Sequence, residues 1–269
     1  MANWAFVGNS FVPDPEARIS VHDLALQRGY AVFDFMRLAG NEPFHGDDHI
    51  RRFLSSAAHM HLPVGYSEGQ LSELVKELAE RNNQPGTGIR CMLTGGIASD
   101  DGTFHPTLVI SQHPLEIPSS LMYESGIRLA TYPYQRQLPY IKTTDYIMSI
   151  WLQPFLRSRQ ADDVLYVNRD MISECPRSNI FIVDKNRRII TPGKMVLEGI
   201  TRSRVLQAAR QFYEIETRDV SISELADAGE VFVTSTSRQI LPVRSVDGYT
   251  YRGENRVVTN HLMDLIQSP

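Results

Sequence analysis

Three short segments of the chain carry side chains that could take part in catalysis. The first holds an amine, Lys142, and the second holds a carboxylate, Glu174. The third, Gly199-Ile200-Thr201, stands at the start of a predicted helix. An amine can act as a nucleophile and move a proton, a carboxylate can hold a cationic ring, and a helix start can bind a phosphate. Pyridoxal phosphate chemistry requires this combination.

Lys142 lies just before a predicted helix that Asp145 can cap. The apolar face of that helix would carry Ile147, Ile150, Trp151, Phe155 and Leu156. A lysine here can line a pocket wall, where partial desolvation lowers its pKa and prepares it to react with an aldehyde cofactor. Taken alone, a lysine is most often a solvated surface residue, so the interpretation depends on the other two segments.

Glu174 is expected at the end of a strand. Residues 163–167 and 171–173 alternate like the two arms of a hairpin, and residues 179–183 and 188–190 flank a second polar turn. A carboxylate held between these hairpins can pair with a pyridinium nitrogen and keep it protonated, which lets the ring accept electrons. An isolated glutamate in a loop would instead be exposed.

The third segment is interpreted as a turn followed by a helix. Residues 200–209 have helical apolar spacing after Gly199. The unbonded amides and the positive dipole end of such a helix would receive a phosphate, and the Thr201 hydroxyl adds a donor. Every helix has such an end, so this signal is weak on its own.

In this order and spacing, the segments resemble those of the class IV aminotransferases, pyridoxal phosphate enzymes of fold type IV. The family includes D-amino acid transaminases, branched-chain aminotransferases and aminodeoxychorismate lyases, and the similarity runs from Ile19 to about Val246. The resemblance implies an α+β, two-domain fold like that of D-amino acid aminotransferases. Lys142 matches the family's Schiff-base lysine and Glu174 its pyridine-nitrogen partner.

The resemblance also assigns the remaining contacts to pyridoxal 5'-phosphate. The amides of Ile200 and Thr201 match the family's phosphate clamp, and Leu197 matches an apolar side chain against the ring. Two further phosphate ligands are implied outside these segments, Arg52 and Thr236.

Residues 23–37 resemble a family segment that reaches into the active site, partly that of the neighbouring subunit. A homodimer with its active site near the interface is therefore expected, with Phe33 as a substrate contact. The family often has Glu where this chain has Asp34, and small residues where it has Phe35 and Met36. These departures affect the size of the substrate pocket.

Three arginines are candidates for binding the substrate carboxylate: Arg28, Arg90 and Arg177. The planar fork of arginine binds a carboxylate through two parallel hydrogen bonds. Several such residues near one pocket favour an acidic substrate or a tightly held carboxylate. Arg37 and Arg136 are weaker candidates. Pairing of Arg90 within its own lobe is the alternative.

The predicted reaction is transfer of an amino group between an amino acid, here a D-amino acid, and a 2-oxo acid such as 2-oxoglutarate. A branched-chain L-amino acid aminotransferase and a 4-amino-4-deoxychorismate lyase are the alternatives, because both share the cofactor residues. A pyridoxal phosphate carrier without turnover is disfavoured, since a pure binder needs no carboxylate such as Glu174 at the ring nitrogen.

Composition limits the partners. The chain has 269 residues, 42% of them hydrophobic, and a formal net charge of −4, so it offers no basic field for nucleic acid or an anionic membrane. Its two cysteines, Cys91 and Cys175, form neither a disulfide framework nor a metal motif. The crowded histidines between residues 45 and 61 lack ligand spacing, and no metal is expected. We expect a cytoplasmic protein that acts on small molecules.

The organisation expected is a small α+β domain over residues 1–114, a linker over 115–120 and a larger cofactor-binding domain over 121–269. The first domain would contain strands at Trp4–Val7, Ser10–Val12, Val32–Leu38, Gly88–Thr94 and Thr107–Gln112, and helices over residues 47–60 and from Ser67. The second would add strands at Glu230–Thr234 and Ile240–Val246 and a closing helix from Asn255.

Overall fold

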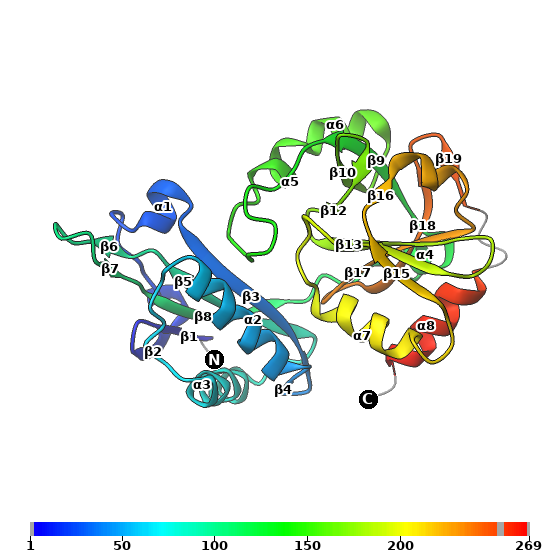
Figure 1. The fold of residues 1–269 in the computed structure, drawn as a ribbon. Coiled ribbons are helices and arrows are strands. Elements are labelled where there is room, and N and C mark those ends of the chain that lie inside the picture. Colours follow the sequence, from blue (N-terminus) through cyan, green and yellow to red (C-terminus); the bar gives the residue numbers. More distant parts are fainter. Residues whose placement is uncertain (1–2, 252–255, 268–269) are drawn as a thin grey trace. The chain divides into compact units, whose positions relative to one another are not determined.

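The computed structural model describes residues 3–251 and 256–267, which form two compact units (Figure 1). Unit 1 takes in the described residues up to Glu116 together with Ile141–Asp145; unit 2 contains Ile117–Tyr140 and the described residues from Tyr146 onward. The sequence grouped residues 141–145 with the second domain. Their backbone pairs instead with strand β3 (Ala31–Ala39), because the Phe33 N–H donates to the Lys142 carbonyl at 3.0 Å.

Unit 1 is an antiparallel sheet of six strands with two helices packed on it (Figure 1). The strand order is β2 (Ser10–Pro13), β1 (Trp4–Val7), β8 (Leu108–Pro114), β5 (Thr87–Thr94), β3 and β4 (Glu42–Pro43). The helices are α2 (Gly46–His59) and α3 (Glu68–Asn82). Shorter elements are η1 (Asp14–Glu16), α1 (Leu24–Arg28), β6 (Ile97–Ala98) and β7 (Phe104–His105).

Alternation along β3 decides which side chains meet the helices. Val32, Met36 and Leu38 are buried in the core shared with α2 and α3, so the even-numbered positions face the helices. Phe33 and the other odd-numbered positions face the opposite side of the sheet. The strands and the two helices predicted for this unit are confirmed. Ser67 starts α3 with a capping box formed with Gln70.

Unit 2 is built on one long mixed sheet. Its strand order is β15 (Ile215–Arg218), β14 (Ile189–Pro192), β13 (Ser178–Val183), β17 (Glu230–Ser235), β18 (Gln239–Val246), β9 (Ile127–Pro133), β10 (Asp163–Asn168), β11 (Met171–Ile172) and β16 (Val220–Ser221). β12 (Glu174–Cys175) pairs with β13, and β19 (Tyr249–Thr250) pairs with β18. β15 and β16 are the first and last strands in this order, yet only Asp219 separates them in the sequence. The two edges of the sheet must therefore lie next to each other, so the sheet is strongly curved.

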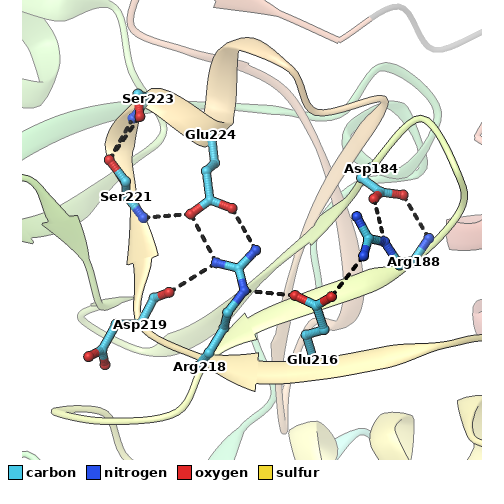
Figure 2. Close-up of polar contacts among 8 residues, drawn as sticks. All are labelled: Asp184, Arg188, Glu216, Arg218, Asp219, Ser221, Ser223 and Glu224. Atoms are coloured by element: carbon cyan, nitrogen blue, oxygen red, sulfur yellow. Dashed lines mark hydrogen bonds and ion pairs between the residues drawn. The ribbon is translucent and has the colours of Figure 1, made fainter.

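An ion-pair network braces the corner where the sheet closes (Figure 2). Arg218 donates from Nη2 to Glu224 Oε2 at 2.7 Å and from Nε to Glu216 Oε2 at 2.7 Å. The other Glu216 oxygen accepts from Arg188 at 2.9 Å. Glu224 also accepts from the Ser221 N–H at 2.9 Å, which starts the helical turn η2 (Ile222–Ala226). The network joins three elements at one corner.

The sheet of unit 2 has apolar side chains on both faces. One face packs against α7 (Ile200–Ala209) and α8 (Val257–Gln267), where Phe181 and Phe232 stack with ring centroids 4.8 Å apart. Ile180, Val233 and their neighbours form a second core on the opposite face, where α4 (Ser120–Ser125) contributes partly buried side chains. The hairpins predicted around Glu174 and the strands after residue 230 are confirmed. The predicted start of the last helix, Asn255, lies outside the described residues.

The helix predicted after Lys142 differs from expectation. It is split into α5 (Ile147–Trp151) and α6 (Gln153–Arg159), and Tyr146 rather than Asp145 is the N-cap. Of its predicted apolar face, Leu156 is buried and Phe155 packs beside it. Ile147, Ile150 and Trp151 are 69%, 72% and 63% exposed, so they face out of unit 2. The split between the two helices falls at Pro154, because proline lacks an N–H donor and cannot continue the helical hydrogen bonds of α5.

Two further observations bear on the setting of the chain. No helix among residues 3–251 and 256–267 is long and apolar enough to cross a membrane. Cys91 and Cys175 are buried free thiols, and burial raises the pKa of both well above the ordinary value.

Candidate functional site

Lys142 is held against strand β3 in unit 1. Its backbone N–H donates to the Ser56 hydroxyl at 3.3 Å and its carbonyl accepts from the Phe33 N–H at 3.0 Å. Its Nζ lies 4.7 Å from the centroid of the Phe33 ring, within cation–π distance. Phe33 is 8% exposed. The predicted amine is therefore half-buried over an aromatic face.

Arg90 approaches the same ring from the neighbouring strand. It pairs with Phe35 across β3 and β5, and its guanidinium carbon lies 5.0 Å from the Phe33 ring centroid. Lys142, Phe33 and Arg90, all predicted from the sequence, are thus brought together within unit 1. Arg28 is exposed at the end of α1, where its guanidinium donates to the Gln27 carbonyl at 2.9 Å.

Arg52 is part of a buried charge cluster that the sequence did not reveal. Its Nε and Nη2 donate to the two carboxylate oxygens of Asp34 at 2.7 and 2.8 Å. The Nδ1 atom of His49 lies 2.7 Å from Asp34 Oδ1. Burial acts to raise the pKa of Asp34, but Arg52 and His49 outweigh it and hold the pKa below its ordinary value. His49 and Arg52 are three residues apart on one face of α2, and this spacing is the sequence feature that indicates a shared partner.

Glu174 is buried in unit 2, and its carboxylate is surrounded by donors. Its exposed fraction is 4%. Arg136 Nη1 donates to Oε1 at 3.0 Å, and the Leu197 N–H donates to Oε2 at 2.9 Å. The ion pair favours the charged form of the carboxylate. Arg136, a weaker candidate for the substrate carboxylate, is therefore occupied by Glu174. Arg136 and Glu174 are 38 positions apart in the sequence, so no local pattern indicated this pairing.

A row of polar side chains extends across the sheet from Glu174. Glu174 pairs with Asn179 across β12 and β13, and Asn179 pairs with Thr234 across β13 and β17. Directly opposed residues project to the same face, so all three point toward the α7 side of the sheet. Asn179 and Thr234 are 5% and 1% exposed. Neither Asn179 nor Thr234 is among the site residues expected from the sequence, although the short turn at residues 176–177 is the signal that pairs Glu174 with Asn179.

The start of α7 lies on this same face. Gly199 is the N-cap and no side chain caps the helix; the first helical bond runs from the Ser203 N–H to the Gly199 carbonyl at 2.9 Å. The amides of Ile200 and Thr201 therefore have no acceptor within the helix. Leu197, Ile200 and Thr201 are all half-buried there. The predicted phosphate clamp thus stands close to Glu174.

Arg202 adds a buried positive charge to the start of α7. It is 6% exposed, and its Nη2 donates to the Pro192 carbonyl at 3.0 Å. Burial lowers the pKa of Arg202, while Glu198 and Glu174 act to raise it. Within the described part of the chain, neither its Nε nor the hydroxyl of Thr234 has a hydrogen-bond partner. Two buried polar groups on this face are therefore unsatisfied.

The last two predicted residues lie on turns of unit 2. Arg177 is exposed in the two-residue turn that joins β12 to β13, because Cys175 and Ser178 are paired. Thr236 is half-buried in the turn between β17 and β18. Arg177 is thus three residues from Glu174 in sequence, at the tip of its hairpin.

The residues of unit 2 fit pyridoxal phosphate. A buried carboxylate suits the protonated ring nitrogen, and the first amides of α7, which have no acceptor within the helix, suit a phosphate. The Arg202 Nε and the Thr234 hydroxyl on the same face are two buried polar groups to which a bound ligand could supply partners. The groups of three or more acidic, histidine or cysteine side chains that a metal ion would need are not found in the described residues.

Known proteins share both sequence and fold with this chain. A model of the amino-transferase class IV family matches residues 31–246, which include Lys142, Glu174 and the start of α7. A D-alanine aminotransferase of Bacillus licheniformis is 27% identical over 242 residues, covering 87% of this chain and 85% of that protein.

Two solved structures illustrate the fold. The branched-chain amino acid aminotransferase of Escherichia coli superposes with a TM-score of 0.91 at 24% identity, over 99% of this chain and 94% of that one. A putative 4-amino-4-deoxychorismate lyase of Legionella pneumophila gives a TM-score of 0.86 at 23% identity, over 94% and 96% of the two chains. The α+β fold predicted from the sequence is confirmed.

Proposed function

The chain belongs to the class IV aminotransferase family, and from this premise we propose that it is a pyridoxal phosphate-dependent transaminase of D-amino acids. It would move an amino group between a D-amino acid and a 2-oxo acid such as 2-oxoglutarate. The observation that carries the proposal is the buried Glu174 carboxylate, paired with Arg136 and bonded to the Leu197 amide just before α7.

Lys142 is the proposed Schiff-base lysine and the proton-transfer group. Bound pyridoxal phosphate would supply an electron-accepting ring, which stabilises the negative charge that develops at the substrate α-carbon. The Lys142 amine takes the α-proton from the amino donor and, in the reverse half-reaction, returns a proton to the α-carbon of the oxo acid. The Phe33 ring limits the positions open to this amine, because Nζ lies 4.7 Å from its centroid.

The remaining residues would hold the cofactor. Glu174, which is paired with Arg136, would accept a hydrogen bond from the ring nitrogen. The phosphate would be bound by the residues that the resemblance assigns to it, Arg52, Ile200, Thr201 and Thr236. Leu197 would pack against the ring. The two hydrogen bonds to Asp34 fix the guanidinium plane of Arg52, so its remaining N–H donors also point in a fixed direction.

Substrate binding is proposed for Arg28, Arg90, Arg177 and Phe33. Arg90 stands beside Lys142 and Phe33 within unit 1, which supports a role in holding the α-carboxylate. Arg177 is exposed on the turn next to Glu174, which supports contact with a second carboxylate. These arginines favour an acidic amino acid.

Two other reactions suit the same cofactor residues. A branched-chain L-amino acid aminotransferase would exchange the pockets for the carboxylate and the side chain. A 4-amino-4-deoxychorismate lyase would use Lys142 to release pyruvate from an aromatic dianion, which several arginines also suit. The 27% identity to a D-alanine aminotransferase supports the D-amino acid reaction. A homodimer and a cytoplasmic location remain proposals.

Half-reactions with single amino donors distinguish these alternatives. Protein loaded with pyridoxal phosphate should lose its visible absorbance with D-alanine or D-glutamate and recover it with 2-oxoglutarate. Conversion by L-leucine alone would favour the branched-chain enzyme. If none of these donors nor L-glutamate reacts, pyruvate release from aminodeoxychorismate would identify the lyase.

The role of Arg177 can be tested with a matched variant. Arg177→Gln should raise KM for D-glutamate about ten-fold or more and change KM for D-alanine much less, because a bidentate charge contact is lost. Arg169 is exposed on the neighbouring hairpin turn, so Arg169→Gln is the control and should change neither value. Equal effects on both substrates would contradict the assignment.

A further inference from the structure

We propose that Asn179 is a positioning residue that couples Glu174 to the start of α7, so that one side chain sets the carboxylate and the phosphate clamp together. The inference rests on the proposed function, since it assumes that Glu174 and α7 serve one cofactor. Asn179 was not among the residues expected from the sequence. Its contacts connect the hairpin that carries Glu174 to the turn that precedes the helix.

The amide nitrogen of Asn179 is shared between two acceptors. Nδ2 donates to the Leu197 carbonyl at 2.8 Å and lies 3.5 Å from Glu174 Oε2. The same Glu174 oxygen accepts from the Leu197 N–H at 2.9 Å. Leu197 is therefore held at both its backbone groups, once by Asn179 and once by Glu174. These three residues form a closed set of hydrogen bonds.

The amide oxygen of Asn179 contacts Gly199, the N-cap residue of α7. A Cβ added to Gly199 would lie 2.2 Å from Oδ1, closer than any side chain can approach, so the side chain packs directly on the Gly199 backbone. Gly199 has ordinary extended dihedral angles, φ −68° and ψ 136°, so contact with Asn179 rather than backbone conformation requires glycine here. Asn179 thus also fixes the residue that starts α7.

Only a side-chain amide of this size can both donate to the Leu197 carbonyl and pack an uncharged oxygen against Gly199. A carboxylate would place charge against the Leu197 carbonyl and Glu174, and an aliphatic side chain would leave buried groups unpaired. Because Asn179 is 5% exposed and stands between Glu174 and Thr234 in the sheet, water cannot easily replace it. Loss of the amide should therefore displace the ring partner and the helix start at once.

Asn179→Ala and Asn179→Asp test the coupling, with Thr191→Val as the control. Thr191 donates a buried hydrogen bond to the Ile180 carbonyl at 2.8 Å in the same sheet, so its variant measures the loss of a structural bond near Asn179. The dissociation constant of pyridoxal phosphate, read from visible absorbance, and the pH profile of kcat are measured for each folded variant. Circular dichroism verifies folding.

Asn179→Ala should raise the dissociation constant about ten- to a hundred-fold and shift the pH profile of kcat, because Glu174 loses a fixed position. Thr191→Val should lower the melting temperature and leave the dissociation constant and the pH profile of kcat unchanged.

In Asn179→Asp the loss of cofactor affinity should be largest at mildly alkaline pH. It should shrink, relative to the unchanged protein, at mildly acidic pH, where a protonated carboxyl regains a donor toward Leu197. If Asn179→Ala fails to fold, this pH-dependent recovery decides the question alone.

Wild-type cofactor affinity and pH profile in both Asn179 variants would overturn the proposal. A loss of affinity equal to that of Thr191→Val, with an unchanged pH profile, would overturn it as well. Failure of the proposed function gives a different result, because the unaltered protein would then show no pyridoxal phosphate absorbance at all.

Discussion

At the scale of single residues, two buried carboxylates, Asp34 and Glu174, are each paired with an arginine. Asp34 is fully buried with Arg52 and His49, and Glu174 is buried with Arg136. Removing one member of such a pair leaves an unpaired charge in a medium that solvates it poorly, which costs more than the pair contributes. Arg52 and Glu174, which the sequence predicts as separate cofactor ligands, are therefore each held by a buried partner of opposite charge.

Asp34→Asn should destabilise the protein by roughly 3–5 kcal/mol at neutral pH, because Arg52 and His49 lose their buried counter-charge. Urea unfolding measures this difference. Glu77→Gln is the control, since the exposed Arg81–Glu77 pair contributes at most about 0.5 kcal/mol. Comparable losses in both variants would contradict a special role for the buried cluster.

The effect of Asp34 should also depend on pH in a defined direction. Its pKa is lowered in the folded state, so its stabilising contribution is complete above the unfolded value of about 3.9 and declines as pH falls toward the lower folded value. The stability difference between the natural protein and Asp34→Asn should therefore be constant near neutrality and shrink in acid. A difference that grows in acid would contradict the ion-pair account.

At the scale of elements, the alternation of apolar residues and the spacing of turns predicted most of the helices and strands. They did not predict which distant segments pair with each other. The hairpins beside Glu174, the two helices of unit 1 and the start of α7 appear where the sequence pattern indicates. The pairing of residues 141–145 with β3 depends on contacts more than a hundred residues apart, which local patterns do not encode. The predicted apolar face of α5 is exposed, not buried, for a related reason. Periodicity shows that a helix has an apolar face, but it does not show which part of the protein covers that face.

The corner that closes the unit 2 sheet provides a test at this scale. Arg218 bonds both Glu216 and Glu224 and lowers the pKa of Glu224 through that hydrogen bond (Figure 2). Arg218→Met should destabilise the protein by about 1 kcal/mol at low salt, and the loss should shrink with added salt because these side chains are partly exposed. Thermal unfolding at two salt concentrations measures it. Lys185→Met, which removes the exposed pair with Asp227, is the control and should show almost no change.

At the scale of the whole molecule, the apolar side chains on α5 bear on the proposed homodimer. Ile147, Ile150 and Trp151 occupy positions i, i+3 and i+4 and are each more than 60% exposed. Large apolar groups exposed side by side mark contact surfaces. We expect these three side chains to be covered by a second copy of the chain.

Light scattering should therefore give twice the chain mass of 30.5 kDa. Trp151→Glu should shift the protein toward the monomer, because a charge would be buried in the contact. Leu121 is 65% exposed on α4, and Leu121→Glu is the matched control expected to leave the dimer intact. A monomeric natural protein, or a dimer indifferent to Trp151→Glu, would refute this contact.

Lys142→Ala tests most directly the proposal that Lys142 is the reactive amine of a pyridoxal phosphate transaminase. The purified natural protein should show a visible absorbance band that an amino donor removes and a 2-oxo acid restores. Lys142→Ala should lack both the band and turnover, whereas Lys185→Ala, which changes an exposed lysine, should retain them. Turnover that survives in Lys142→Ala would contradict the account.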